Sequence, residues 1–162
     1  MTKIYVTGDT HGLNNIKKIH DFLNTIDGNS LTKNDYMIVL GDFGLLWNCK
    51  KTGLSIDSNP DDKCWTKEEL YWKKWWENKP WTTLFVDGNH ECYDRLETYP
   101  VSEWHGGKVQ KISDSIIHLM RGEVYDIQLP VDDTNDMTTY FYLANYITSL
   151  KNISALKPKV VN

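Results

Sequence analysis

The sequence lacks the features that would place it in a secreted, membrane or disulfide-rich class. It has three cysteines (Cys49, Cys64 and Cys92), an odd number without a C-x-x-C pair. A disulfide framework is therefore not expected, and a reducing compartment fits better. No stretch approaches the roughly 20 apolar residues of a membrane span, and the chain reaches Gly8 and Asp9 too soon for the apolar region of a signal peptide. We interpret the protein as cytoplasmic, without a membrane partner.

The charge is too mild to indicate a partner. The formal net charge is -4 at pH 7, and no basic face of the kind that binds the backbone of DNA or RNA is visible. The 162 residues, of which 40% are hydrophobic and 25% charged, are typical of one soluble globular domain. The composition gives no strong nucleic-acid signal, so the motifs must carry the inference of function.

Patterns of apolar residues predict alternating strands and helices in the first half of the chain. We expect strands over residues 4–7, 36–40 and 82–86, and helices over residues 14–26 and 66–78. Asp27-Gly28-Asn29 is expected to stop the first helix, and Thr66 with Glu69 forms a capping box for the second. Residues 48–64 are expected to form an exposed loop. This order of elements is typical of a parallel α/β sheet.

The second half has a less regular pattern. Residues 115–120 and 123–129 flank Arg121-Gly122 and are predicted to form a hairpin. Residues 130–136 are expected to be a polar turn region, and residues 137–150 fit either a helix or a strand. Residues 157–162 are expected to form a loose tail.

Three short polar segments follow the three predicted strands. They are Gly8-Asp9-Thr10-His11-Gly12, Gly41-Asp42-Phe43-Gly44 and Gly88-Asn89-His90-Glu91. Gly-Asp and Gly-Asn pairs also occur in ordinary turns, but three such pairs with two histidines after three strands favour metal binding. Carboxylate and imidazole ligands suit Mn, Fe or Zn, and two ions held together could clamp the oxygens of a phosphoryl transfer.

In order and in strand context, these segments resemble the GDxHG, GDxxx and GNHE motifs of calcineurin-like metallophosphoesterases. The segments Trp104–Lys108 and Ile117–Gly122 also resemble small phage and bacterial members, and the likeness covers about residues 1–127. It implies an α/β sandwich with an N-terminal parallel βαβαβ half and, in this chain, a partial second sheet. We expect a truncated metallophosphoesterase-like domain over 1–129 and a divergent segment over 130–162, a packed helix or strand followed by the tail.

The resemblance also implies roles for individual residues. Asp9 and His11 would bind the first metal ion, Asp42 would bridge both ions, and Asn89 would bind the second. His90 would act near the leaving oxygen, as a general acid or by stabilising the transition state, because its unperturbed pKa is near neutral. The implied reaction is hydrolysis of a phosphate mono- or diester, including a nucleotide, by a hydroxide activated on two Mn, Fe or Zn ions.

The later histidine ligands of complete family members are missing from this sequence. No histidine lies beyond His118, so we expect the second ion to be held weakly and the activity to be impaired. Three explanations stay open: a truncated product, one half of a split enzyme whose partner chain supplies ligands, or a binding protein that kept the fold. The last would be an inactive phage regulator or inhibitor that binds a nucleotide or a protein.

Several residues near the motifs have two interpretations each. Glu91 is either a partner of the metal ligands or the acidic start of a helix. His105 either lines the cleft or belongs to a turn, and for His118 packing or a backbone hydrogen bond is favoured over metal binding. Three tryptophans flank the polar segment and could stack on a nucleobase, although packing is favoured: Trp47, Trp65 and Trp81.

Overall fold

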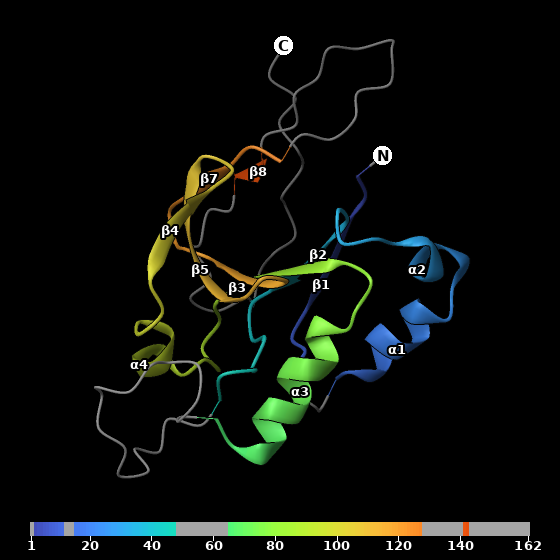
Figure 1. Ribbon diagram of the computed structural model, residues 1–162, viewed down its shortest axis with the longest axis horizontal. Coiled ribbons are helices and arrows are strands. Elements are labelled where there is room, and N and C mark those ends of the chain that lie inside the picture. Colours follow the sequence, from blue (N-terminus) through green and yellow to red (C-terminus); the bar gives the residue numbers. More distant parts are fainter. Residues whose placement is uncertain (1, 12–14, 48–64, 128–140, 143–162) are drawn as a thin grey trace, which may run out of the picture.

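A computed structural model describes four parts of the chain, residues 2–11, 15–47, 65–127 and 141–142 (Figure 1). The expected loop at 48–64, the polar turn at 130–136 and the tail at 157–162 lie outside the described residues. So does most of the segment 130–162. Of the stretch 137–150, the structure describes Phe141 and Tyr142, which form a strand.

The first half of the chain forms a parallel sheet with helical connections. Its elements are β1 (Ile4–Gly8), α1 (Lys17–Leu23), α2 (Ile26–Ser30), β2 (Tyr36–Leu40), α3 (Lys67–Glu77) and β3 (Thr82–Val86). β1 pairs with β2, and β2 pairs with β3, both in parallel. All three predicted strands are confirmed. So is the second helix with its capping box, in which the Thr66 side chain accepts from Glu69 N–H and the Glu69 side chain accepts from Thr66 N–H.

The prediction of one helix over residues 14–26, stopped by Asp27-Gly28-Asn29, is wrong. α1 ends at Leu23, and those three residues lie inside α2. Thr25 causes the break, because it has extended backbone and its hydroxyl caps the second helix by accepting from Gly28 N–H at 3.0 Å. Gly28 lets the two helices approach, since a Cβ there would lie 2.2 Å from the Phe22 carbonyl oxygen.

The predicted hairpin of residues 115–120 with 123–129 is also wrong. The second half contains α4 (Tyr93–Leu96), β4 (Val101–Trp104), β5 (Gly107–Ser113), β6 (Ile116–Leu119), β7 (Val124–Tyr125) and β8 (Phe141–Tyr142). β6 pairs with β3 on one side and with β5 on the other. Both edges of β6 are therefore taken, and β7 pairs with β8 in a second sheet.

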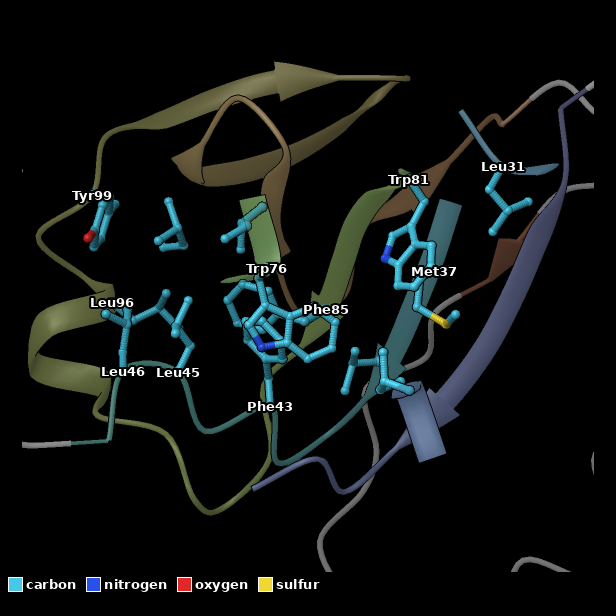
Figure 2. Close-up of a cluster of buried hydrophobic side chains, with 14 residues drawn as sticks. Leu31, Met37, Phe43, Leu45, Leu46, Trp76, Trp81, Phe85, Leu96 and Tyr99 are labelled. Carbon is cyan, nitrogen blue, oxygen red and sulfur yellow. The ribbon is translucent and has the colours of Figure 1, made fainter. Parts of the chain in front are cut away.

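The large sheet has the order β1-β2-β3-β6-β5-β4 and a core on each face. Figure 1 shows α1 and α3 against one face of the parallel strands, with the β7–β8 pair beyond the other. The core on the helical face centres on Phe43, which stacks on Phe85 and meets the edge of Trp76 (Figure 2). The core on the opposite face contains Ile38, Leu84, Val109, Ile117, Leu119, Tyr125 and Ile127.

This architecture confirms the expected fold class. A six-stranded mixed α/β sheet carries a parallel βαβαβ half, and within the described residues the second sheet consists of β7 and β8. None of the described helices combines the length and the apolar character of a membrane span.

The cysteines differ from the expectation of unpaired thiols. Cys92 is fully buried and disulfide-bonded, and the residue at the other end of the bond lies outside the described residues. The inference of a reducing compartment, which depended on unpaired cysteines, loses this support.

The capping box of α3 gives a test of the fold. We expect Thr66→Ala to lower the free energy of unfolding by about 1 kcal/mol, because Glu69 N–H loses its acceptor at the helix start. Urea unfolding followed by tryptophan fluorescence measures the change. Lys67→Ala is the matched control, since this exposed residue lies in the same turn. Equal stability of both variants would contradict the role of the cap.

Candidate metal centre

The three polar segments meet at the carboxyl ends of β1, β2 and β3. Parallel pairing brings these ends to one edge of the sheet, which is where open α/β sheets place their ligand sites. Backbone hydrogen bonds then join the loops. Asp9 N–H donates to the Gly41 carbonyl at 3.2 Å, His11 N–H to the Asp42 carbonyl at 2.9 Å, and Gly41 N–H to the Val86 carbonyl at 3.1 Å.

Three site residues adopt a left-handed backbone conformation. The φ angles are 50° for Asp9, 46° for His11 and 48° for Asp42. This region is unfavourable for residues other than glycine and costs on the order of 1–3 kcal/mol per residue when the surroundings impose it. The strain lies in the loops that carry the predicted ligands, where it directs their side chains towards one place.

His11, Asp42 and His90 form a group of potential ligands. Their ligand atoms all lie within 4.8 Å of one another. His11 Nε2 is 3.7 Å from Asp42 Oδ2 and 4.0 Å from Asp9 Oδ1. These separations are too long for hydrogen bonds. Two ligands on one ion, each at roughly 2.1 Å, lie roughly 3–3.5 Å apart, so this donor set fits a divalent ion with a small inward shift.

Gly88 is the position where the β2 and β3 loops come closest. A Cβ at residue 88 would lie 2.0 Å from Asp42 Oδ1 and 2.3 Å from Asp42 N. Only glycine leaves room for the Asp42 carboxylate against this backbone. The same oxygen accepts a hydrogen bond from His90 N–H at 3.0 Å. This bond fixes the Asp42 side chain against the backbone of His90.

Asp9 and Asn89 flank the group. The Asp9 loop is tied to the following segment, since Asn15 Nδ2 donates to the Asp9 carbonyl at 2.8 Å and Lys18 Nζ donates to the Gly8 carbonyl. Asn89 precedes His90 in the same loop and is exposed.

Glu91 joins the β2 and β3 loops from below the surface. Its carboxylate is buried and accepts from Gly44 N–H at 3.1 and 3.2 Å. Burial, with a smaller contribution from the charges of Asp42 and Asp87, raises the pKa of Glu91 to about 8, although the backbone hydrogen bonds from Gly44 and Phe43 oppose the rise. Of its two interpretations, the structure favours the partner of the site over a solvated helix start.

An ionic network centred on the buried Asp87 lies directly behind the β3 loop, and the sequence analysis did not identify it. Asp87 Oδ1 lies 3.2 Å from His118 Nε2, and Asp87 Oδ2 accepts from Arg121 Nε at 2.7 Å. Burial opposes ionisation of Asp87, but the hydrogen bonds from His118 and Arg121 outweigh it and lower the pKa to about 2. The available signal was the position of Asp87, which directly follows a buried strand.

The network continues to the backbone of Gly88. Arg121 Nη2 donates to the Tyr93 hydroxyl at 2.5 Å, and that hydroxyl donates to the Gly88 carbonyl. Asp87, Arg121 and Tyr93 therefore support the loop that approaches Asp42. β6 pairs in parallel with β3 and carries His118, and Arg121 follows the end of β6. This pairing brings both side chains to Asp87.

The two other candidate histidines lie outside the metal group. His118 is buried and places its Nδ1 3.0 Å from Gln110 Oε1, so it is packed as expected but bonds to side chains rather than to the backbone. His105 lies in the β4–β5 turn with φ of 48° and its Nδ1 is 2.9 Å from the Asp126 carbonyl. It lines a pocket of about 530 Å³ near Thr2, before β1, rather than the carboxyl ends of the strands.

The chain is similar to a known protein family over nearly its whole length. The sequence model of the family described as calcineurin-like phosphoesterase matches residues 2–157, which extends past residue 127, where the motif likeness ends. No curated protein matches the chain. A crystal structure of a protein of unknown function from Aquifex aeolicus is similar at 20% sequence identity and a TM-score of 0.31. The alignment covers 67% of this chain and 58% of the Aquifex protein. The similar part is therefore less than two thirds of the Aquifex protein's length.

The contact at Gly88 can be tested through metal affinity. We expect Gly88→Ala to weaken Mn²⁺ binding by roughly 10–100-fold, a loss typical of disturbing what orients a ligand, because the new Cβ displaces the Asp42 carboxylate. Equilibrium dialysis with elemental analysis measures the binding. Gly106→Ala is the control, since its Cβ meets nothing within 4 Å and a positive φ makes it strained but remote. Unchanged affinity in Gly88→Ala would show that Asp42 does not bind the ion.

Proposed function

We propose that this chain, which belongs to the calcineurin-like phosphoesterase family, is a metal-dependent phosphoesterase that hydrolyses a phosphate mono- or diester. The observation that carries the proposal is the convergence of His11, Asp42 and His90, whose ligand atoms lie within 4.8 Å of one another. Each comes from a different strand end, so the convergence depends on the tertiary fold.

The donor set supports two metal positions that differ in their affinity for an ion. Asp9 and His11 would hold one ion, Asn89 would hold the other, and Asp42 would reach both, since it lies between the β1 and β3 loops. Divalent Mn, Fe or Zn ions there would polarise phosphoryl oxygens and activate water. The Asn89 side has fewer protein donors than the Asp9 side within the described residues, so the second ion would bind more weakly.

His90 is the proposed proton donor to the leaving oxygen. Its ring lies 4.9 Å from the ring of His11, and its backbone N–H is fixed on Asp42. The side chain is therefore at the site but held through its backbone, which suits proton transfer to a bound ester. His90 also belongs to the group of potential ligands, so its role has to be separated from metal binding by experiment.

A second candidate function is binding without catalysis, to a nucleotide or a protein partner. The supporting observation is that His105 and His118 are already engaged, the former at the Asp126 carbonyl and the latter between Gln110 and Asp87. Neither completes the metal group among the residues that the structure describes. This arrangement would suit a site that holds a phosphate ester but turns it over slowly, or one that a partner chain completes.

The role of Asp42 can be tested by removing its charge. We expect Asp42→Asn to abolish Mn²⁺-dependent hydrolysis of bis(p-nitrophenyl) phosphate, because the variant keeps the size of the side chain but loses the carboxylate. Asp21→Asn is the matched control on α1, where the side chain is exposed, and its activity should equal that of the original protein. If Asp42→Asn retains full turnover, the bridging role is wrong.

The role of His90 can be tested with two leaving groups. We expect His90→Ala to lower kcat for phenyl phosphate by about 10²–10⁴-fold without loss of bound Mn²⁺. The effect on p-nitrophenyl phosphate should be smaller, because its leaving group needs no proton. Steady-state kinetics and elemental analysis give both answers. Loss of metal from the variant would identify His90 as a ligand instead.

A further inference from the structure

Trp47 is exposed at the edge of the metal group. Its indole stacks on the ring of His90 with centroids 5.0 Å apart and planes 12° from parallel. It also lies 6.2 Å from the ring of His11, edge to face. Nevertheless 49% of the residue remains exposed. Its ring contacts within the described residues are with His11 and His90, so the indole face turned away from His90 has no ring stacked on it there.

The other tryptophans that flank the segment 48–64 are accounted for by packing. Trp81 is fully buried, and its Nε1 donates to Thr83 Oγ1 at 3.2 Å. Trp65 packs against the helical core and has the Arg95 guanidinium over its ring. Trp47 is the one of the three whose side chain is exposed, and it is also the one at the site.

The backbone holds Trp47 firmly in this position. The two preceding residues, Leu45 and Leu46, are buried in the helical core (Figure 2). Cys92 N–H donates to the Leu46 carbonyl at 2.7 Å, which ties this segment to the loop that follows His90. An exposed indole at the end of such an anchored segment is preorganised, so little conformational entropy is lost when a ligand covers it.

We propose that the open face of Trp47 binds the base of a nucleotide whose phosphate lies at the metal group. The proposal rests on the proposed function, because it places the phosphate at His11, Asp42 and His90. A base in van der Waals contact with the indole lies about 3.5–4 Å from it, on the side away from His90. One ribose separates base and phosphate in a nucleotide, so the two groups can reach neighbouring subsites. Every base can stack on an aromatic side chain. The subsite should therefore prefer nucleotides over phosphate esters without a base, but it should not distinguish one base from another.

Direct binding tests the proposal without requiring turnover. The probes are AMP and ribose 5-phosphate, which differ in the base, titrated into the Mn²⁺-saturated protein in a calorimeter. We expect the protein to bind AMP at least about tenfold more tightly than ribose 5-phosphate. Trp47→Leu should remove this preference by weakening AMP alone, whereas Trp47→Phe, which keeps a flat face, should retain most of it. Tyr71→Leu is the control, since Tyr71 is an exposed aromatic residue on α3.

The outcomes separate this inference from the proposed hydrolysis. If Trp47→Leu weakens both ligands equally, Trp47 acts only by packing on His90 and the proposal is overturned. Equal affinity of the original protein for AMP and ribose 5-phosphate, or no affinity for AMP, also overturns it. Selective AMP binding that depends on Trp47 supports the base subsite even if no ester is hydrolysed, in which case the hydrolase proposal fails alone. Hydrolysis of both probes with equal kcat/KM supports the hydrolase and overturns the base subsite.

Discussion

The close approach of Asp42 to the backbone at Gly88 is the contact on which the site depends. Asp42 follows β2, and Gly88 follows β3, so parallel pairing brings these two loops together. At that distance any side chain at residue 88 would occupy the space of the Asp42 carboxylate. The carboxylate in turn accepts from His90 N–H. A single missing Cβ therefore fixes the positions of one central carboxylate and one central imidazole.

The β3 loop needs support from behind, because a loop that only touches Asp42 could move away from it. The network of Asp87, His118, Arg121 and Tyr93 provides this support. Asp87 is ionised in the interior because the hydrogen bonds from His118 on β6 and from Arg121 just after it outweigh the desolvation of the carboxylate. The strand next to β3 thus contributes to the site without contributing a ligand, and the correct position of β6 in the sheet becomes a requirement of the site.

The sequence predicted those parts of the structure that depend on local patterns. β2 reads as a nearly continuous apolar run and is buried at its three central residues, and the capping box of α3 is encoded in four residues. The errors arose where tertiary contacts determine where a helix ends or which strands pair. The break at Thr25 depends on one hydroxyl, and the pairing of β6 depends on which strand edges are free. The meeting of the three loops followed from strand order. The position of Asp87 after a buried strand marked it as a candidate, but its role depends on His118 and Arg121, which come from a distant part of the sequence.

The carboxylates near the site differ in how they are satisfied, and this difference indicates where a cation belongs. The two oxygens of Asp87 face His118 and Arg121, and those of Glu91 accept from Gly44 N–H. These acids are accounted for by the protein itself. Asp9 and Asp42 differ, because in the described part of the chain Asp42 Oδ1 accepts from His90 N–H, while Asp9 Oδ1 and Asp42 Oδ2 meet His11 only at 3.7–4.0 Å. Carboxylates that converge without donors repel one another unless a positive charge joins them. Negative charge that no donor in the described part of the chain compensates is therefore concentrated around Asp9, His11 and Asp42, which makes this the place that most favours a divalent cation.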